Sequence, residues 1–181
     1  DPCVFIIKDM IILVYVEDCI LVSPSSAVIK AFIESLANGP EQFAFTDEGS
    51  MDKYLGVDIQ KLGDGNFVLR QPFLIQRILE ALGIEPSMTN KRSVPVVGPL
   101  LSRDTDGPAR KHTWSYRSVI GMLGYLQGST RPEISMAVHQ CARFNAYPML
   151  CYEKAVKRIA RYLLNSSDKG IIYKPDSTRG L

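Results

Sequence analysis

Two adjacent carboxylates, Glu17 and Asp18, are the residues whose types and spacing most directly indicate chemistry in this 181-residue sequence. They interrupt two apolar runs, residues 11–16 and 19–22, that are typical of strands in a protein interior. Like charges side by side repel, and the free-energy cost of this repulsion increases at the edge of an apolar core. A shared Mg²⁺ would remove the repulsion, because this ion takes carboxylate oxygens and keeps positions for water and phosphate. The pair is therefore a candidate metal site for phosphoryl transfer, and a plain polar turn is the alternative.

The elements that must position this pair come from the first 70 residues. Residues 4–8, 11–16 and 19–22 are near-continuous apolar, β-branched runs, which predict strands covered on both faces. A helical apolar pattern follows over residues 26–36 and stops at Asn38-Gly39. Alternation from Leu55 and a Gly-rich turn then predict a hairpin that ends near residue 70.

The rest of the chain reads as helical. Gln71-Pro72 starts a helix that continues to Leu82, and a Pro- and Gly-containing connector without periodicity fills residues 85–113. Three more helices are predicted, over about 115–127, from Thr130 to before Tyr147, and over about 150–164. For the middle one, Thr130 and Glu133 match the spacing of a capping box.

Charge divides the sequence in two. Residues 1–90 hold 6 Lys and Arg against 13 Asp and Glu, whereas residues 91–181 hold 15 against 6, for an overall net charge of +2. The last predicted helix carries a basic stripe at helical spacing, formed by Lys154, Lys157, Arg158 and Arg161. Such a stripe fits contact with a nucleic-acid backbone, and the alternative is an ordinary solvated face.

Composition excludes several classes of protein. The sequence is 46% hydrophobic and 22% charged, which is typical of a globular chain. The longest early apolar run is far short of the ~20 residues that span a bilayer, and no signal peptide is recognisable, so no membrane partner is expected. Cys3, Cys19, Cys141 and Cys151 lack metal-site spacing and read as reduced, mostly buried thiols, so an intracellular location, in a cytoplasmic particle or the nucleus, is expected.

Several segments, in a fixed order, resemble one family. Tyr15-Val16-Glu17-Asp18 resembles the Tyr-x-Asp-Asp hairpin of reverse transcriptases. The segments that follow are similar to those of copia-type (Pseudoviridae-like) LTR retrotransposons: Leu55-Gly56-Val57-Asp58-Ile59, Gln71-Pro72-Phe73-Leu74-Ile75, Tyr116-Arg117 through Tyr125-Leu126, Thr130-Arg131-Pro132-Glu133-Ile134, and Lys157-Arg158 through Tyr162-Leu163. Phe73 and Leu74 depart from the family pattern. The resemblance extends over nearly the whole chain.

This resemblance implies an α+β fold. Residues 1–70 would be the C-terminal part of the palm, an antiparallel sheet plus a helix, and residues 71–181 a mostly helical thumb and connection. The implied activity is RNA-directed DNA synthesis, a nucleotidyltransferase reaction, with Mg²⁺ or Mn²⁺ as cofactor. The implied partners are an RNA/DNA template–primer duplex, deoxynucleotides, and the remainder of a polyprotein with its fingers and ribonuclease H.

The resemblance also implies roles for single residues. Asp18 and Glu17 would be the catalytic metal ligands, and the basic stripe would hold nucleic-acid backbone. The residues near the primer or nucleotide would be Tyr15, Val16, Leu55 and Gly56. Gly56 suits a close approach of backbone to a ligand, and the alternative is a strand glycine lying under a neighbouring side chain.

Two features are expected to limit catalysis. The family uses a third carboxylate on a strand upstream of the hairpin, and the chain begins after that point, so we expect a fragment that is inactive alone. Glu17 stands where the family has Asp, and its side chain reaches roughly 1.5 Å further, which predicts a weakened metal site. The competing hypothesis is a non-catalytic module, decayed or domesticated, that binds nucleic acid through its basic half.

Overall fold

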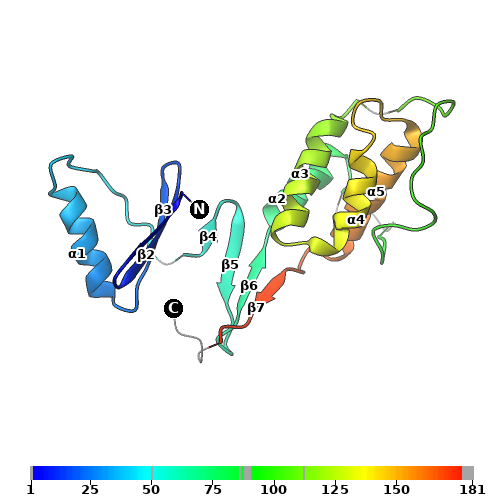
Figure 1. Cartoon of the computed structure of the whole chain (residues 1–181). Coiled ribbons are helices and arrows are strands. Elements are labelled where there is room, and N and C mark those ends of the chain that lie inside the picture. Colours follow the sequence, from blue (N-terminus) through cyan, green and yellow to red (C-terminus); the bar gives the residue numbers. More distant parts are fainter. Residues whose placement is uncertain (1, 50, 86, 88–90, 112, 177–181) are drawn as a thin grey trace. The chain divides into compact units, whose positions relative to one another are not determined.

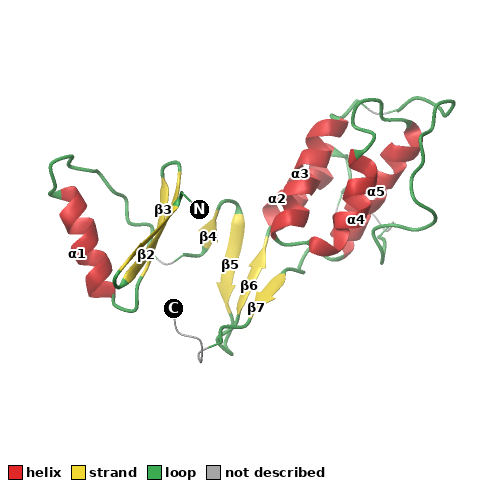
Figure 2. Cartoon of the chain, viewed as in Figure 1, coloured by secondary structure: helices red, strands yellow, loops and turns green. Residues whose placement is uncertain are grey.

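The computed structural model describes residues 2–49, 51–85, 87, 91–111 and 113–176, and divides the chain into two compact units (Figure 1). Unit 1 is Asp1–Ser50 and unit 2 is Met51–Leu181. Both contain antiparallel sheet, and unit 2 adds a separate helical layer, which confirms the α+β class (Figure 2). No helix in the described ranges is both long and apolar enough to cross a bilayer.

Unit 1 is a three-stranded sheet and one helix. Strands β1 (Val4–Ile7), β2 (Met10–Tyr15) and β3 (Asp18–Val22) pair antiparallel in that order. The predicted helix is α1 (Ser26–Ala37), and it ends where expected, with the backbone N–H of Asn38 donating to the Glu34 carbonyl.

The strands of unit 1 are not covered on both faces, contrary to the expectation from their apolar sequence. Every residue of β1 is exposed, and the Ile6 side chain is 75% exposed. Only Met10 and Ile12 of β2 are buried, and α1 has no buried residue. One helix and three strands offer too little apolar surface to form a second layer over the sheet.

The sheet of unit 2 joins residues from both ends of that unit. Strands β4 (Lys53–Tyr54), β5 (Val57–Lys61) and β6 (Phe67–Arg70) are consecutive, and β7 (Ile171–Tyr173) pairs with β6. Figure 1 shows β7, in red, alongside β6. Gly170 permits this pairing, because a Cβ at that position would collide with the Leu69 carbonyl oxygen.

Four α-helices pack together and supply nearly all of the core: α2 (Pro72–Ala81), α3 (Tyr116–Ser129), α4 (Ser135–Ala142) and α5 (Leu150–Asn165). Each buries one apolar stripe, as the sequence predicts for an amphipathic helix. Completely or almost completely buried side chains include Ile78, Leu123, Val138, Val156 and Leu163.

The start of the helix predicted from Thr130 differs from the expected capping box. A 3₁₀ helix, η1 (Pro132–Ile134), precedes α4. The Thr130 hydroxyl donates to Oε1 of Gln71 (2.9 Å), and the Glu133 carboxylate accepts from Nε of Arg131 (2.7 Å). The Thr130 hydroxyl therefore has a partner distant in sequence, and the Glu133 carboxylate is paired with Arg131, two residues away, so the reciprocal bonds of a capping box do not form.

The first unit ends at residue 50, earlier than the domain boundary expected at residue 70. Strands β4 to β6 belong with the helices because β6 leads directly into α2 and pairs with the strand that follows α5. The identification of palm and thumb remains a prediction.

Candidate functional site

The Glu17–Asp18 pair lies at the tip of the β2–β3 hairpin. Tyr15 and Asp18 are the last paired residues, so Val16 and Glu17 form a two-residue loop. Val16 has a φ of 55° and its side chain is 86% exposed. A positive φ at the first loop position suits the backbone twist of a hairpin, but it is unusual for a β-branched residue.

Tyr15 and Asp18 share one face of this hairpin, because directly opposed residues in an antiparallel pair project to the same side. Glu17 and Asp18 are both exposed. Within the described parts of the chain, neither carboxylate has an ion-pair or hydrogen-bond partner that would compete with a bound cation. Their oxygens are the ligand type that Mg²⁺ takes, and one or two carboxylates are its usual share from protein. The residues present therefore fit such an ion.

The described residues contain no group of three or more His, Cys, Asp or Glu side chains placed to hold a metal ion. This hairpin thus contributes two carboxylates to a metal site, and the remaining coordination positions of the ion would be open. The expected roles of Glu17 and Asp18 as metal ligands remain predictions.

Leu55 and Gly56 form the two-residue turn between β4 and β5, with φ values of 49° and 73°. Two positive φ values are what a type I′ hairpin turn requires. No atom lies within 4 Å of a Cβ built on Gly56, so the alternative of a strand glycine under a neighbouring side chain is wrong. The Tyr125 hydroxyl of α3 donates to the Leu55 carbonyl and fixes this turn against the helical layer. Sequence reasoning did not identify Tyr125.

The basic stripe of α5 is less uniform than its spacing suggested. Lys154 is exposed, whereas Lys157 pairs with the buried Glu153 (Nζ to Oε1, 3.6 Å). Arg158 and Arg161 are half-buried, and the backbone N–H of Arg92 donates to the Arg161 carbonyl (3.3 Å). The connector therefore passes along this face of α5, and Arg92 adds a cation that sequence reasoning missed, since the connector has no periodicity to place it.

Cys141 and Cys151 are not placed as reactive thiols. Burial raises the pKa of the Cys141 thiol to about 12, and desolvation also raises the pKa of Cys151, with the Asp104 carboxylate adding to the effect. Both thiols stay protonated near neutral pH and are poor nucleophiles. Cys3 and Cys19 are exposed, so the expectation of mostly buried thiols is wrong for these two. Cys3 lies before the first strand, and Cys19 is the second residue of β3, next to the exposed hairpin tip.

Comparison with known proteins finds relatives that match along almost the whole chain. The transposon Ty5-1 protein YCL074W of Saccharomyces cerevisiae is 25% identical over 170 residues, which are 94% of this chain and 54% of the relative. The retrovirus-related Pol polyprotein from transposon RE2 of Arabidopsis thaliana is 25% identical over 93% of this chain, and that from transposon TNT 1-94 of Nicotiana tabacum is 30% identical over 90%.

The chain spans about half of the Ty5-1 protein, but only 11% of the RE2 polyprotein and 13% of the TNT 1-94 polyprotein. No family profile matches the chain. No solved structure matches it either.

Proposed function

This chain is homologous to a segment of copia-type, transposon-encoded Pol polyproteins, and from that premise we propose that it is part of a reverse transcriptase, an RNA-directed DNA polymerase. The observation that carries the proposal is the β2–β3 hairpin. Its two-residue loop presents Glu17 and Asp18 to solvent beside Tyr15, at the point where the sequence resembles the Tyr-x-Asp-Asp element.

In the proposed site, Asp18 holds Mg²⁺ or Mn²⁺ with its carboxylate, and Glu17 supplies the neighbouring oxygens. The ion, when bound, supplies charge stabilisation for the attacking and leaving oxygens of a phosphoryl displacement. The Tyr15 ring lies on the same face as Asp18, next to the primer end or the nucleotide. In unit 2, and separately from this metal site, the Leu55–Gly56 turn, with its backbone held by Tyr125, is proposed to contact the primer strand.

Glu17 is proposed to be the weaker ligand of the pair. It belongs to the loop, whereas Asp18 is held by pairing with Tyr15 at the end of β3. Its longer side chain has more rotamer freedom to lose when it binds an ion of near-octahedral geometry. Asp18 therefore makes the larger contribution to metal affinity.

Mn²⁺ titration of the full chain tests this proposal. Asp18→Asn removes the principal carboxylate without changing the shape of the side chain, and we expect it to abolish the paramagnetic broadening of NMR signals from residues 15–18. Asp9→Asn is the matched control, because Asp9 is also an exposed Asp at a turn of the same sheet. Identical titrations for the wild type and Asp18→Asn would contradict a metal site at this hairpin.

A further inference from the structure

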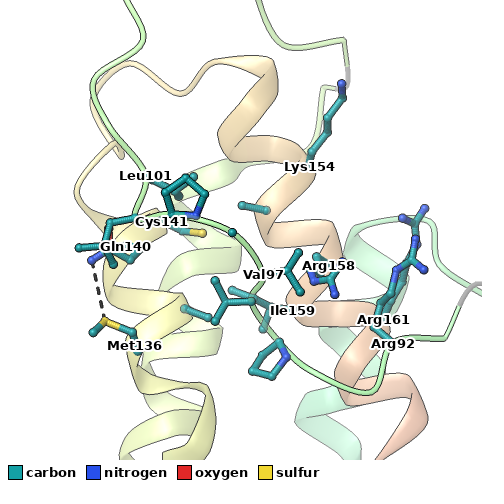
Figure 3. A pocket seen from close by; sticks show the side chains of 17 residues that line it. Arg92, Val97, Leu101, Met136, Gln140, Cys141, Lys154, Arg158, Ile159 and Arg161 are labelled. Atoms are coloured by element: carbon teal, nitrogen blue, oxygen red, sulfur yellow. Dashed lines mark hydrogen bonds between the residues drawn. The ribbon is translucent and has the colours of Figure 1, made fainter.

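A pocket of about 550 Å³ lies between the connector and helices α4 and α5 (Figure 3). Residues 95–101 form one wall, and Met136, Ala137, Ala155 and Ile159 of the two helices contribute to the other. Its volume is in the range of sites that hold small molecules. The lining contains four cationic side chains, Arg92, Lys154, Arg158 and Arg161, and no carboxylate.

Among the described residues, the guanidinium groups of Arg92, Arg158 and Arg161 have no anionic partner. Arg92 and Arg161 lie next to each other at one end of the pocket in Figure 3, consistent with the hydrogen bond between their backbones. The Nε atoms of Arg158 and Arg161 are buried and have no hydrogen-bond partner among the described residues. Guanidinium groups donate to phosphate oxygens in a bidentate geometry, so an anion of this kind would satisfy both the charge and the unpaired donors.

The remainder of the pocket has a different character. Val97 and Ile159 lie in its middle, and Gln140 lies at the end away from Arg92 and Arg161 (Figure 3). Val97 is 59% exposed although its neighbours in the pocket are apolar, so a ligand could still cover it. The Gln140 amide accepts from Nη1 of Arg143 (3.1 Å) and donates weakly to the Met136 sulfur (3.9 Å), which leaves one N–H and one oxygen lone pair for the edge of a nucleobase. From one end to the other, the pocket thus offers an anion site, an apolar surface and an amide.

We propose that this pocket binds a nucleoside phosphate, with the phosphate on Arg92, Arg158 and Arg161 and the base over Val97 toward Gln140. The proposal deepens the proposed function and rests on it, because it assigns a ligand to the basic face of α5. A base in a duplex is stacked and paired, so only an unpaired nucleotide enters the pocket. Its source is either a free mononucleotide or a single strand.

Calorimetric titration of the full chain with thymidine monophosphate, thymidine and inorganic phosphate tests the proposal. We expect the monophosphate to bind at least tenfold more tightly than either part alone, because only it engages both ends of the pocket. Arg92→Ala is expected to weaken binding about tenfold, the loss of one charge-assisted contact. Lys91→Ala is the matched control, because it removes the same charge next to the pocket but outside its lining.

A second pair of variants separates the apolar wall from the charge. Val97→Asp places a carboxylate in the pocket, whereas Val94→Asp places one in the same segment outside the lining. We expect only Val97→Asp to lower the affinity of the chain for labelled single-stranded oligothymidylate, measured by fluorescence anisotropy. Neither is expected to change the affinity for the same sequence in a duplex by more than about twofold.

The outcomes distinguish this inference from the proposed function. Equal effects of Val97→Asp and Val94→Asp, or no preference for the monophosphate over its parts, overturn the pocket assignment even if duplex binding is normal. Absence of duplex binding even at low salt, with monophosphate binding intact, instead contradicts the contact with nucleic-acid backbone that the sequence predicts for the basic stripe of α5.

Discussion

Val16 and Leu55 are the two non-glycine residues that take a positive φ in the hairpin turns of the described chain. The left-handed region is unfavourable for L-residues by roughly 1–2 kcal/mol. Each of them lies in a two-residue turn for which the family resemblance implies a place near the primer or nucleotide. At these turns the backbone conformation is imposed by strand pairing, which holds the turn carbonyls and neighbouring side chains in defined positions.

The hydrogen bond from Tyr125 to the Leu55 carbonyl predicts the effect of removing one hydroxyl. Tyr125→Phe is expected to destabilise the protein by about 1 kcal/mol, because the carbonyl loses its donor. Thermal unfolding followed by circular dichroism would show a melting temperature lower by a few degrees. Tyr147→Phe is the control, because the Tyr147 side chain is 86% exposed, and an equal fall in both variants would contradict the role given to Tyr125.

The residues of the hairpin tip were predictable from sequence, but their conformation was not. Apolar runs on both sides of Glu17 and Asp18 require a turn at this place, whatever the packing around it. A β-branched residue such as Val16 predicts extended backbone, so its positive φ depends on the register of β2 with β3. Tyr125 gave no local signal, because its partner is 70 residues away in sequence.

The helices were predicted from the periodicity of apolar residues. The observed elements differ from the predicted ones where residues distant in sequence make contact. The bounds of α2 and α5 follow their apolar stripes closely. The predicted cap at Thr130 is wrong because Gln71, at the end of the adjoining sheet, takes the hydroxyl. Strand β7 was not predicted, since three residues carry too little pattern and its pairing with β6 is a tertiary contact.

The approach of Gly170 to Leu69 predicts a strong effect of one methyl group. Gly170→Ala is expected to separate β7 from β6, because the added Cβ collides with a backbone oxygen that cannot move aside alone. Hydrogen exchange at residues 67–69 and 171–173 would report the loss of pairing. Unchanged exchange in Gly170→Ala would contradict the close approach.

Gly128→Ala in α3 is the control for adding a methyl group, because a Cβ at Gly128 has no atom within 4 Å. We expect this substitution to stabilise the helix by about 1 kcal/mol.

At the scale of the molecule, the two units differ in how well they bury their apolar residues. Unit 2 contains the whole helical core, whereas unit 1 buries only Met10 and Ile12. The composition, which averages 46% hydrophobic, could not indicate this asymmetry. The division after residue 50 was likewise not predictable, because it depends on β7 returning to the sheet.

Truncation tests this division. Residues 51–181 are expected to unfold cooperatively on their own, because their core is complete. A chain that starts at residue 71 loses β4 to β6 and the buried Val68, and we expect a clearly lower melting temperature. Calorimetry on both fragments would measure the difference. Equal stability of the two would show that the sheet contributes nothing to the helical layer.

The pairing of β6 with β7 also sets the order of events during synthesis. Phe67 cannot meet Tyr173 until more than a hundred further residues have left the ribosome. The hairpin of β5 and β6 therefore emerges with one edge of β6 unpaired. The helices between β6 and β7 have time to associate first through local contacts. Strand β7, translated after the helices, closes this edge of the sheet, so ribosome stalling before residue 171 would leave an exposed edge available to other nascent chains.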